Sequence, residues 1–306
     1  MALKIIFMGT PEFSVPILKS IHNSKHNVIE VYTQPPKKKN RGQLINFTPI
    51  HEFSNKNNIN VRCPDQLNTE EEIKNLKKQK PDVVVVVAYG KLLPSKFLNF
   101  ENIKFINVHA SLLPKWRGAA PIQRSIMNLD KETGISIMKI ISKLDAGPYL
   151  LQKSVKIDDK DNFLSLSKKL SNVASELILD ALDLLKDNKG KFIDQKEDLV
   201  TYAEKINKKE SVINWNESAE KIIAKVRGLG PYPGVWFKHN STRIKIIEAE
   251  IFQENGKPGE VMTNDLVIAC AEKAIKINLI QKEGKKALKT KNFLAGYKIN
   301  KGEILK

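Results

Sequence analysis

The chain has 306 residues, of which 41% are hydrophobic and 28% charged. A chain of this length and composition can bury two hydrophobic cores, which excludes a mainly disordered protein. The formal net charge of +17 favours a polyanionic partner, although lysine makes up most of the 51 basic residues and an AT-rich genome would produce the same excess.

The first residues and the cysteines indicate the compartment. Residues 1–8 form too short an apolar run for a signal peptide, and no later run approaches the roughly 18 residues that a membrane span needs. We therefore expect a cytoplasmic protein. Cys63 and Cys270 lie far apart without the paired spacing of a zinc site, so we predict two small core residues, no disulfide framework and no metal.

The first half of the chain alternates strand and helix patterns. Runs rich in Val, Ile and Phe predict strands at residues 4–8, 28–33, 82–88 and 104–108, and the five valines at 83–87 indicate a parallel strand buried on both faces. Spaced apolar residues predict helices at 15–23 and 69–78, with Thr69 as the N-cap of the second. This order predicts an α/β fold with a doubly wound, mostly parallel, Rossmann-like sheet.

The catalytic domain is predicted to span residues 1–190. Its last element is a long amphipathic helix at 162–185, after which Gly190 is a candidate C-cap. Residues 191–208 are polar with little periodicity, so we expect a linker along the surface, with a possible short strand at 199–203.

A second domain, residues 209–306, is predicted to be a small β-barrel of the oligonucleotide-binding type. A helix is expected at 218–226, followed by short strand patterns at 234–238, 244–252, 259–263, 265–271 and 274–281. Lysines outnumber acidic residues after residue 271, which predicts a basic surface suited to phosphate contacts.

Two segments of the first half could contact phosphate. Gly9-Thr10-Pro11 follows the first strand, but it lacks both the G-x-G-x-x-G and the G-K-[ST] patterns, so a plain turn is as good an interpretation. Residues 35–43 form a basic insertion that includes Arg41. This insertion is either a solvated segment or an arm that closes on a phosphate backbone.

The strongest candidate site combines Asn107, His109 and Asp145. Asn107 and His109 alternate with Val108, so both side chains should leave the end of a strand on the same side. A single histidine near a strand is more often structural, but the neighbouring amide and a carboxylate in a second loop favour catalysis. An amide and an imidazole stabilise an oxyanion, and a carboxylate orients the imidazole.

At these residues the chain resembles the folate-dependent formyltransferases. The resemblance lies in NVHASLLP at 107–114, WRGAAP at 116–121 and LDAGP at 144–148, with Trp116 where that family often has tyrosine. The opening FMGTPEF at 7–13, the basic insertion, YAEKI at 202–206 and INW at 213–215 resemble the members that act on methionyl-tRNA. The likeness therefore covers nearly the full chain.

The resemblance implies transfer of a formyl group from 10-formyltetrahydrofolate to the α-amino group of initiator methionyl-tRNA. It also implies roles for individual residues. Asn107, His109 and Asp145 would be catalytic, the folate site would be lined by Ser111, Leu112, Leu113 and Pro114, and the tRNA substrate would meet Phe13 and Arg41.

Two alternatives remain open at this point. A formyltransferase or hydrolase acting on a small molecule would share the Asn, His and Asp set, but the basic second domain argues against it. A nucleic-acid-binding protein with a relic α/β half is the more distant alternative. No coiled coil or long exposed apolar helix demands a partner chain, so we expect a monomer.

Overall fold

The valine run forms the most deeply buried strand of the larger sheet in the computed structural model, which describes residues 2–39 and 44–305. All five residues of β6 (Val83–Val87) are buried. The strand lies between β1 (Lys4–Gly9) and β7 (Lys104–His109) and is parallel to both. Val side chains cover both faces of such a strand with β-branched packing surface, as the sequence predicts.

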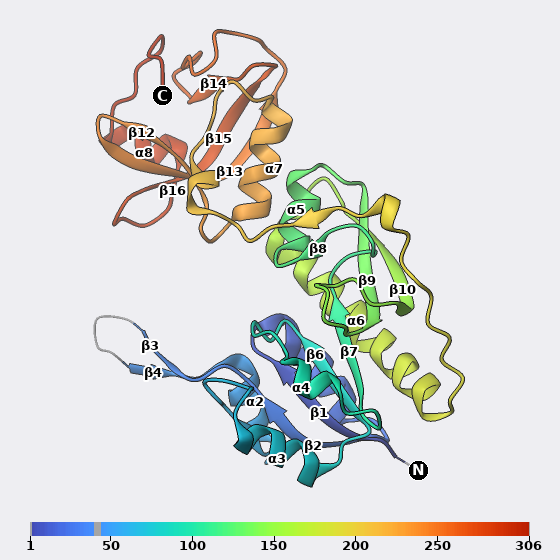
Figure 1. The fold of residues 1–306 in the computed structure, drawn as a ribbon. Helices are drawn as coiled ribbons and strands as arrows, with labels where there is room; N and C mark the ends of the chain where they lie inside the picture. Colours follow the sequence, from blue (N-terminus) through green and yellow to red (C-terminus); the bar gives the residue numbers. More distant parts are fainter. Residues whose placement is uncertain (1, 40–43, 306) are drawn as a thin grey trace. The chain divides into compact units, whose positions relative to one another are not determined.

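Seven strands form this sheet, in the order β10-β9-β7-β6-β1-β2-β5 (Figure 1). The strands β5, β2, β1, β6 and β7 are parallel, whereas β9 is antiparallel to β7. The four strands not yet bounded are β2 (Asn27–Tyr32), β5 (Val61–Arg62), β9 (Glu132–Lys139) and β10 (Tyr149–Lys156). The predicted Rossmann-like parallel sheet is confirmed, and β9 and β10 extend it beyond β7.

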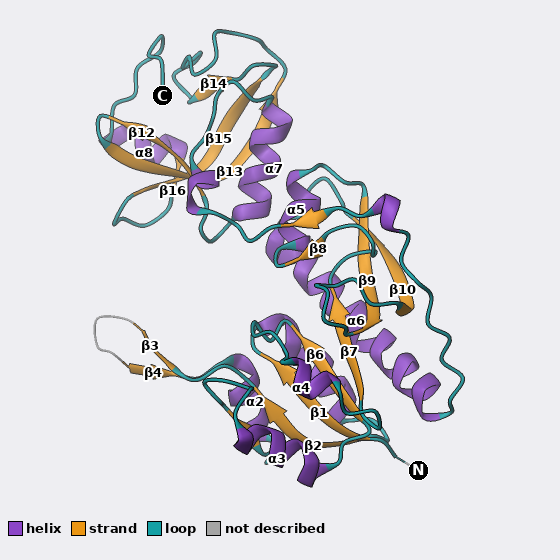
Figure 2. Cartoon of the chain, viewed as in Figure 1, coloured by secondary structure: helices purple, strands orange, loops and turns teal. Residues whose placement is uncertain are grey.

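Helices follow the parallel strands, as Figure 2 shows. Thr69 caps α3, since its side-chain oxygen accepts a hydrogen bond from the Glu72 N–H, as the sequence predicts. The long α6 ends at Lys186, one residue beyond the predicted end, and the left-handed residue that follows it is Asn188 rather than the candidate C-cap Gly190. The helices of this part are α1 (Val15–His22), α2 (Pro49–Lys56), α3 (Glu70–Gln79), α4 (Ser95–Leu98) and α6 (Phe163–Lys186).

Two small ribbons complete the first half. The basic insertion is flanked by an antiparallel pair, β3 (Lys37–Lys39) with β4 (Leu44–Asn46). A second pair joins β8 (Arg117–Gly118) to β11 (Tyr202–Ala203). The short strand expected near residue 200 is therefore present, although short 3-10 turns at Glu197–Leu199 and Lys208–Ser211 occupy more of the predicted linker.

The second half contains an antiparallel sheet that curls into a half-barrel, in the order β12-β13-β15-β14, with β16 also paired to β15. Bulges between Ile246 and Ala249 interrupt the long β13, and bulges of this kind increase twist and allow a strand to curl. The elements are α5 (Pro121–Met127), α7 (Ala219–Leu229), β12 (Val235–His239), β13 (Thr242–Phe252), β14 (Val267–Ala269), β15 (Ala274–Lys282), β16 (Leu288–Lys289) and α8 (Thr290–Gly296).

A continuous hydrophobic core fills this half-barrel. Trp215 packs edge-on against Phe237, with ring centroids 5.7 Å apart, and α7 contributes buried Ile222 and Val226. The strand expected at 259–263 is wrong. Glu260 and Val261 make isolated bridges to two different segments, at Ile304 and Ile268, so no continuous ladder forms.

The chain divides into two compact units whose boundary is not one cut in the sequence. The first unit comprises Met1–Gly118, Thr133–Lys156 and Ser167–Tyr202, and the second comprises Ala119–Glu132, Ile157–Leu166 and Ala203–Lys306. In residues 2–39 and 44–305, no helix is both long and apolar enough to cross a lipid bilayer.

Candidate active site

Strand β7 delivers the first two candidate residues. Asn107 is half-buried and His109 is 5% exposed, while Val108 between them is buried. His109 lies at the carboxyl end of the strand, opposite Ser136 of β9. Ligands and substrates of open α/β sheets are bound at this edge.

Asp145 reaches the same place from the loop between β9 and β10. Its backbone adopts a left-handed conformation, with φ of +45°. Two residues later, at Gly147, the backbone approaches β9 so closely that a Cβ on this residue would lie 1.8 Å from the Lys139 carbonyl oxygen. Only glycine permits this approach, which explains its place directly after the Asp-Ala pair.

The side chains of Asn107 and His109 both face the Asp145 carboxylate. Asn107 Nδ2 lies 3.4 Å from Asp145 Oδ1, and His109 Nδ1 lies 3.7 Å from Asp145 Oδ2. The Gly118 N–H donates to Oδ2 at 2.9 Å, and the φ of Gly118 is +121°. The structure thus brings together the three residues that the sequence combined, with the carboxylate side chain 14% exposed.

His109 has an oxygen acceptor near each ring nitrogen. Nε2 lies 2.8 Å from the Trp116 carbonyl oxygen, and Nδ1 faces Asp145. A neutral imidazole donates from one nitrogen and accepts at the other, whereas the charged ring donates from both. Trp116 has a φ of +62°, a strained value for a bulky residue, and strain of this kind clusters at functional sites.

Residues 111–114, the loop expected to line a folate site, are held by hydrogen bonds from two polar side chains of β9 and β10. Ser136 Oγ donates to the Ser111 carbonyl at 2.6 Å and accepts from the Leu113 N–H at 3.0 Å. Gln152 Nε2 donates to the Leu113 carbonyl at 2.8 Å. The side chains of Ser111 and Leu113 are buried, while Leu112 and Pro114 are half-buried, so this loop presents mainly backbone and apolar surface.

The other residues predicted to contact substrate or phosphate lie outside the Asn107, His109 and Asp145 cluster or outside the described residues. Phe13 is half-buried in a short 3-10 turn, and its carbonyl accepts from Ser171 Oγ at 2.7 Å. Thr10 donates to the Tyr89 carbonyl at 2.8 Å, which is consistent with a plain strand-to-helix turn at Gly9-Thr10-Pro11. Arg41 lies outside the described residues.

Sequence reasoning missed three polar residues that adjoin this site. Arg117 is completely buried, and its Nη2 lies 2.9 Å from Glu197 Oε1 while its Nε donates to Gln195 Oε1 at 3.0 Å. The hydrogen bond from Arg117, and to a lesser extent the one from Lys143, holds the pKa of the Glu197 carboxyl below its usual range. Gln195 and Glu197 belong to the segment interpreted as a linker, whose aperiodic sequence gave no signal of these contacts.

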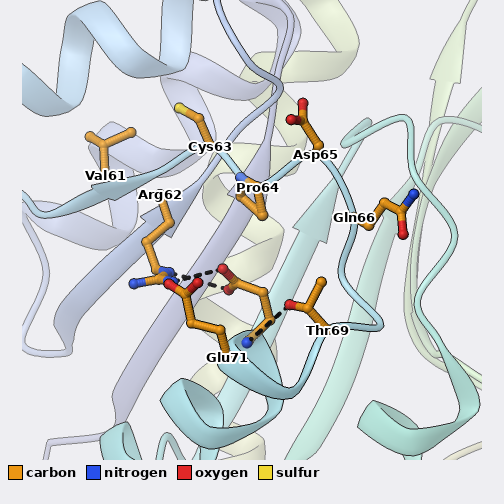
Figure 3. Close-up of a pocket in the computed structure, with 9 residues that line it drawn as sticks. Val61, Arg62, Cys63, Pro64, Asp65, Gln66, Thr69 and Glu71 are labelled. Atoms are coloured by element: carbon orange, nitrogen blue, oxygen red, sulfur yellow. Dashed lines mark hydrogen bonds and ion pairs between the residues drawn. The ribbon is translucent and has the colours of Figure 1, made fainter.

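A pocket of about 570 Å³ opens elsewhere, at the end of β5 and the start of α3 (Figure 3). Its lining residues are Val61, Arg62, Cys63, Pro64, Asp65, Gln66, Thr69, Glu71 and Glu72. Three strands separate β5 from β7, which corresponds to about 19 Å at the usual strand spacing. The pocket therefore includes none of the catalytic candidates.

Arg62 of that pocket pairs with two carboxylates that also line it. Arg62 Nη2 lies 2.7 Å from both Glu71 Oε1 and Glu72 Oε1, and these contacts are drawn in Figure 3. Cys63 lies 3.5 Å from His51 Nδ1, and burial raises the pKa of its thiol. Cys63 is half-buried at this pocket rather than in the core, so the prediction for it is wrong, whereas Cys270 is buried as predicted.

The second unit presents a basic face with an aromatic residue. In the antiparallel register of β12 and β13, Trp236 pairs with Lys245 and Lys238 pairs with Arg243. All four side chains point away from the core, and the guanidinium carbon of Arg243 lies 4.2 Å from the Trp236 ring centroid. Stacked Arg and Trp flanked by lysines are typical of surfaces that bind nucleic acids.

Among residues 2–39 and 44–305, no group of three or more His, Cys, Asp and Glu side chains is arranged to hold a metal ion.

Two family models match the chain. Residues 3–182 match the model described as formyl transferase, and residues 205–298 match the formyl transferase C-terminal domain. The methionyl-tRNA formyltransferase of Pelagibacter ubique is 51% identical over 304 residues, which cover 99% of this chain and 98% of that protein. The methionyl-tRNA formyltransferase of Thermodesulfovibrio yellowstonii is 42% identical over 306 residues, with 99% and 98% covered.

Solved structures share the fold at low identity. HypX from Aquifex aeolicus, in complex with tetrahydrofolic acid, aligns with a TM-score of 0.68 at 16% identity. The alignment covers 100% of this chain and 51% of the HypX chain. This chain thus spans about half of HypX. An N-formyltransferase from Helicobacter canadensis, in complex with folinic acid and dTDP-3-aminofucose, aligns with a TM-score of 0.68 at 20% identity, with 92% of this chain and 100% of that chain covered.

Proposed function

This chain belongs to the formyl transferase family, and from that premise we propose that it formylates the α-amino group of methionine on initiator methionyl-tRNA. The donor is 10-formyltetrahydrofolate, and the product is N-formylmethionyl-tRNA for translation initiation. The observation that carries this proposal is the likeness to methionyl-tRNA formyltransferases over nearly the whole length of both chains.

The donor groups of the site fit a formyl group. One amide N–H of Asn107 is suited to a carbonyl oxygen, since an Asn amide has two N–H donors and only one faces Asp145. His109 Nε2 would exchange the Trp116 carbonyl for the formyl oxygen. We assign the folate site to Ser111, Leu112, Leu113 and Pro114. Because the side chains of Ser111 and Leu113 are buried, they would contribute backbone groups and the half-buried Leu112 and Pro114 would contribute apolar contacts.

The folate co-substrate supplies the formyl carbon, and its nitrogen takes the electron pair of the C–N bond that breaks. A new C–N bond forms at the methionyl amine, which loses one proton, and the departing folate nitrogen takes up one proton. Asn107 and His109 stabilise the negative charge that develops on the formyl oxygen. Asp145 holds His109 in orientation and assists removal of the amine proton through the imidazole or a water molecule.

Several assignments extend this proposal. Phe13 would contact the methionine side chain, and Arg41 would contact the acceptor arm of the tRNA. We retain residues 1–190 as the catalytic domain, 191–208 as the connection and 209–306 as the tRNA-binding domain. The protein would act as a cytoplasmic monomer and without a metal.

Formyl transfer to initiator methionyl-tRNA is the first expected result. The assay measures labelled formyl groups on tRNA with 10-formyltetrahydrofolate as the donor, while glycinamide ribonucleotide competes as a small acceptor. We expect transfer to the tRNA alone. Transfer to the small acceptor without transfer to tRNA would keep the reaction type but overturn the substrate assignment.

Affinity for tRNA should fall steeply with salt, because phosphate contacts release counterions. Replacing Arg243 by alanine should weaken binding at all salt concentrations and reduce the slope of log K against log salt by about 1. Glu283, whose Oε1 lies 3.8 Å from Arg243 Nη1, offers a control, since Glu283→Gln should not weaken binding. A flat salt dependence would refute the assignment of the basic face.

A further inference from the structure

The main chain around Asp145 is held by one side chain from a distant segment. Gln195 Nε2 donates to the Asp145 carbonyl at 2.8 Å and to the Gly147 carbonyl at 2.7 Å. Its Oε1 accepts from Arg117 Nε at 3.0 Å. The amide group of Gln195 thus links the loop that carries the carboxylate to the buried arginine.

The carboxylate of Asp145 is held by Gly118, the residue that follows Arg117. The Gly118 N–H donates to Asp145 Oδ2 at 2.9 Å. Arg117 itself is fixed by Glu197, whose carboxylate also lies 3.1 Å from Lys143 Nζ. The backbone and the side chain of Asp145 are therefore both tied to the pair Arg117-Gly118.

The segment that contains Gln195 also supports the partner of His109. Thr201 Oγ1 accepts from the Trp116 N–H at 2.8 Å, and the Thr201 carbonyl accepts from the Arg117 N–H at 2.9 Å. The Trp116 carbonyl is the group that faces His109 Nε2. Through the side chain of Gln195 and through Thr201, residues 195–201, which we call the clamp segment, thus act on both sides of the His109–Asp145 pair.

The contacts of Gln195 stabilise an otherwise unfavourable loop conformation. Asp145 has a φ of +45°, a left-handed backbone conformation that is unfavourable for residues other than glycine. The carbonyls of Asp145 and Gly147 both point at one amide, so without its N–H groups two oxygen dipoles would face each other unpaired. Relaxation of this loop would turn the carboxylate away from His109 and Asn107.

We propose that Gln195 is a positioning residue for formyl transfer, which acts through Asp145 by fixing the backbone of its loop. This inference rests on the proposed role of Asp145. A displacement of about 1 Å at a reacting group costs up to about 100-fold in rate, so Gln195→Ala should lower kcat by about 30-fold. The KM for tRNA should change by less than about twofold, since the side-chain hydrogen bonds of Gln195 are made to Asp145, Gly147 and Arg117.

Three variants of the full chain separate the contacts. Gln195→Glu keeps an acceptor for Arg117 but loses both N–H donors, so it should lose as much kcat as Gln195→Ala. Asp198→Asn changes an exposed carboxylate of the same segment and should leave kcat unchanged. Near-wild-type kcat in Gln195→Glu would show that Arg117, not the loop, is what Gln195 serves, and would overturn the proposal.

A double-mutant cycle tests whether Gln195 acts through Asp145. In the Asp145→Ala background, Gln195→Ala should have no further effect on kcat, because the group that it positions is absent. An equal loss in both backgrounds would mean a general structural role and would overturn the inference. If the proposed function itself is wrong, wild type and Asp198→Asn will both fail to formylate methionyl-tRNA, a result that differs from either outcome.

Discussion

Replacing His109 by alanine is expected to lower kcat for formyl transfer by about a thousandfold, the combined size of a lost oxyanion donor and a lost proton-transfer group. The ring is 5% exposed and lies between Asp145 and the Trp116 carbonyl, so no other described side chain at these contacts replaces it. Single-turnover kinetics with prebound tRNA would measure the chemical step directly.

The control for this variant is a second histidine of the same unit. His51 is half-buried and contacts Cys63, which follows the edge strand β5. Three strands separate this edge from β7, so His51→Ala should retain kcat. The affinity of His109→Ala for tRNA should stay near that of wild type. A His109→Ala rate within about tenfold of wild type would contradict the proposed role, since even one lost donor costs more.

Replacing Asp145 by asparagine is expected to cost about a thousandfold in kcat with little change in stability. Asparagine keeps the size of the side chain, and its oxygen can stay at the position that faces the Gly118 N–H and His109 Nδ1, but its Nδ2 then presents N–H donors to the Asn107 amide, which needs an acceptor. The charge that orients the imidazole is also lost.

Comparison with two other variants makes this result specific. Asp145→Ala should lose a similar amount of kcat, and Asp194→Asn, an exposed residue beside Gln195, should lose none. Thermal unfolding of all three should be measured alongside the kinetics. If Asp145→Asn retains near-wild-type kcat, the carboxylate charge has no part in the reaction and the mechanism must be revised.

The sequence predicted the buried parallel strands and the pairing of Asn107 with His109, because strand alternation is a local property of the chain. Asp145 was placed with them by chemical argument and resemblance, and the structure brings it into contact distance. Arg117, Gln195 and Glu197 were beyond such reasoning. Their contacts join residues about 80 positions apart through side chains, and no periodicity marks them.

Other differences follow from short or irregular elements. The seven-residue α8 is shorter than the periodic window that identifies a helix, and the bridges at Glu260 and Val261 join two partners, so a strand-like sequence forms no strand. The left-handed residue after α6 is Asn188 instead of the expected Gly190, because asparagine, like glycine, tolerates the left-handed conformation.

The clamp segment affects how relatives could exchange parts by recombination. It lies beyond residue 182, where the first family model ends, yet it belongs to the first compact unit. A crossover near residue 182 would give a hybrid that takes Arg117 and Asp145 from one parent but Gln195 from the other. A crossover after Tyr202 would inherit the whole set from one parent, so active hybrids should favour the later junction.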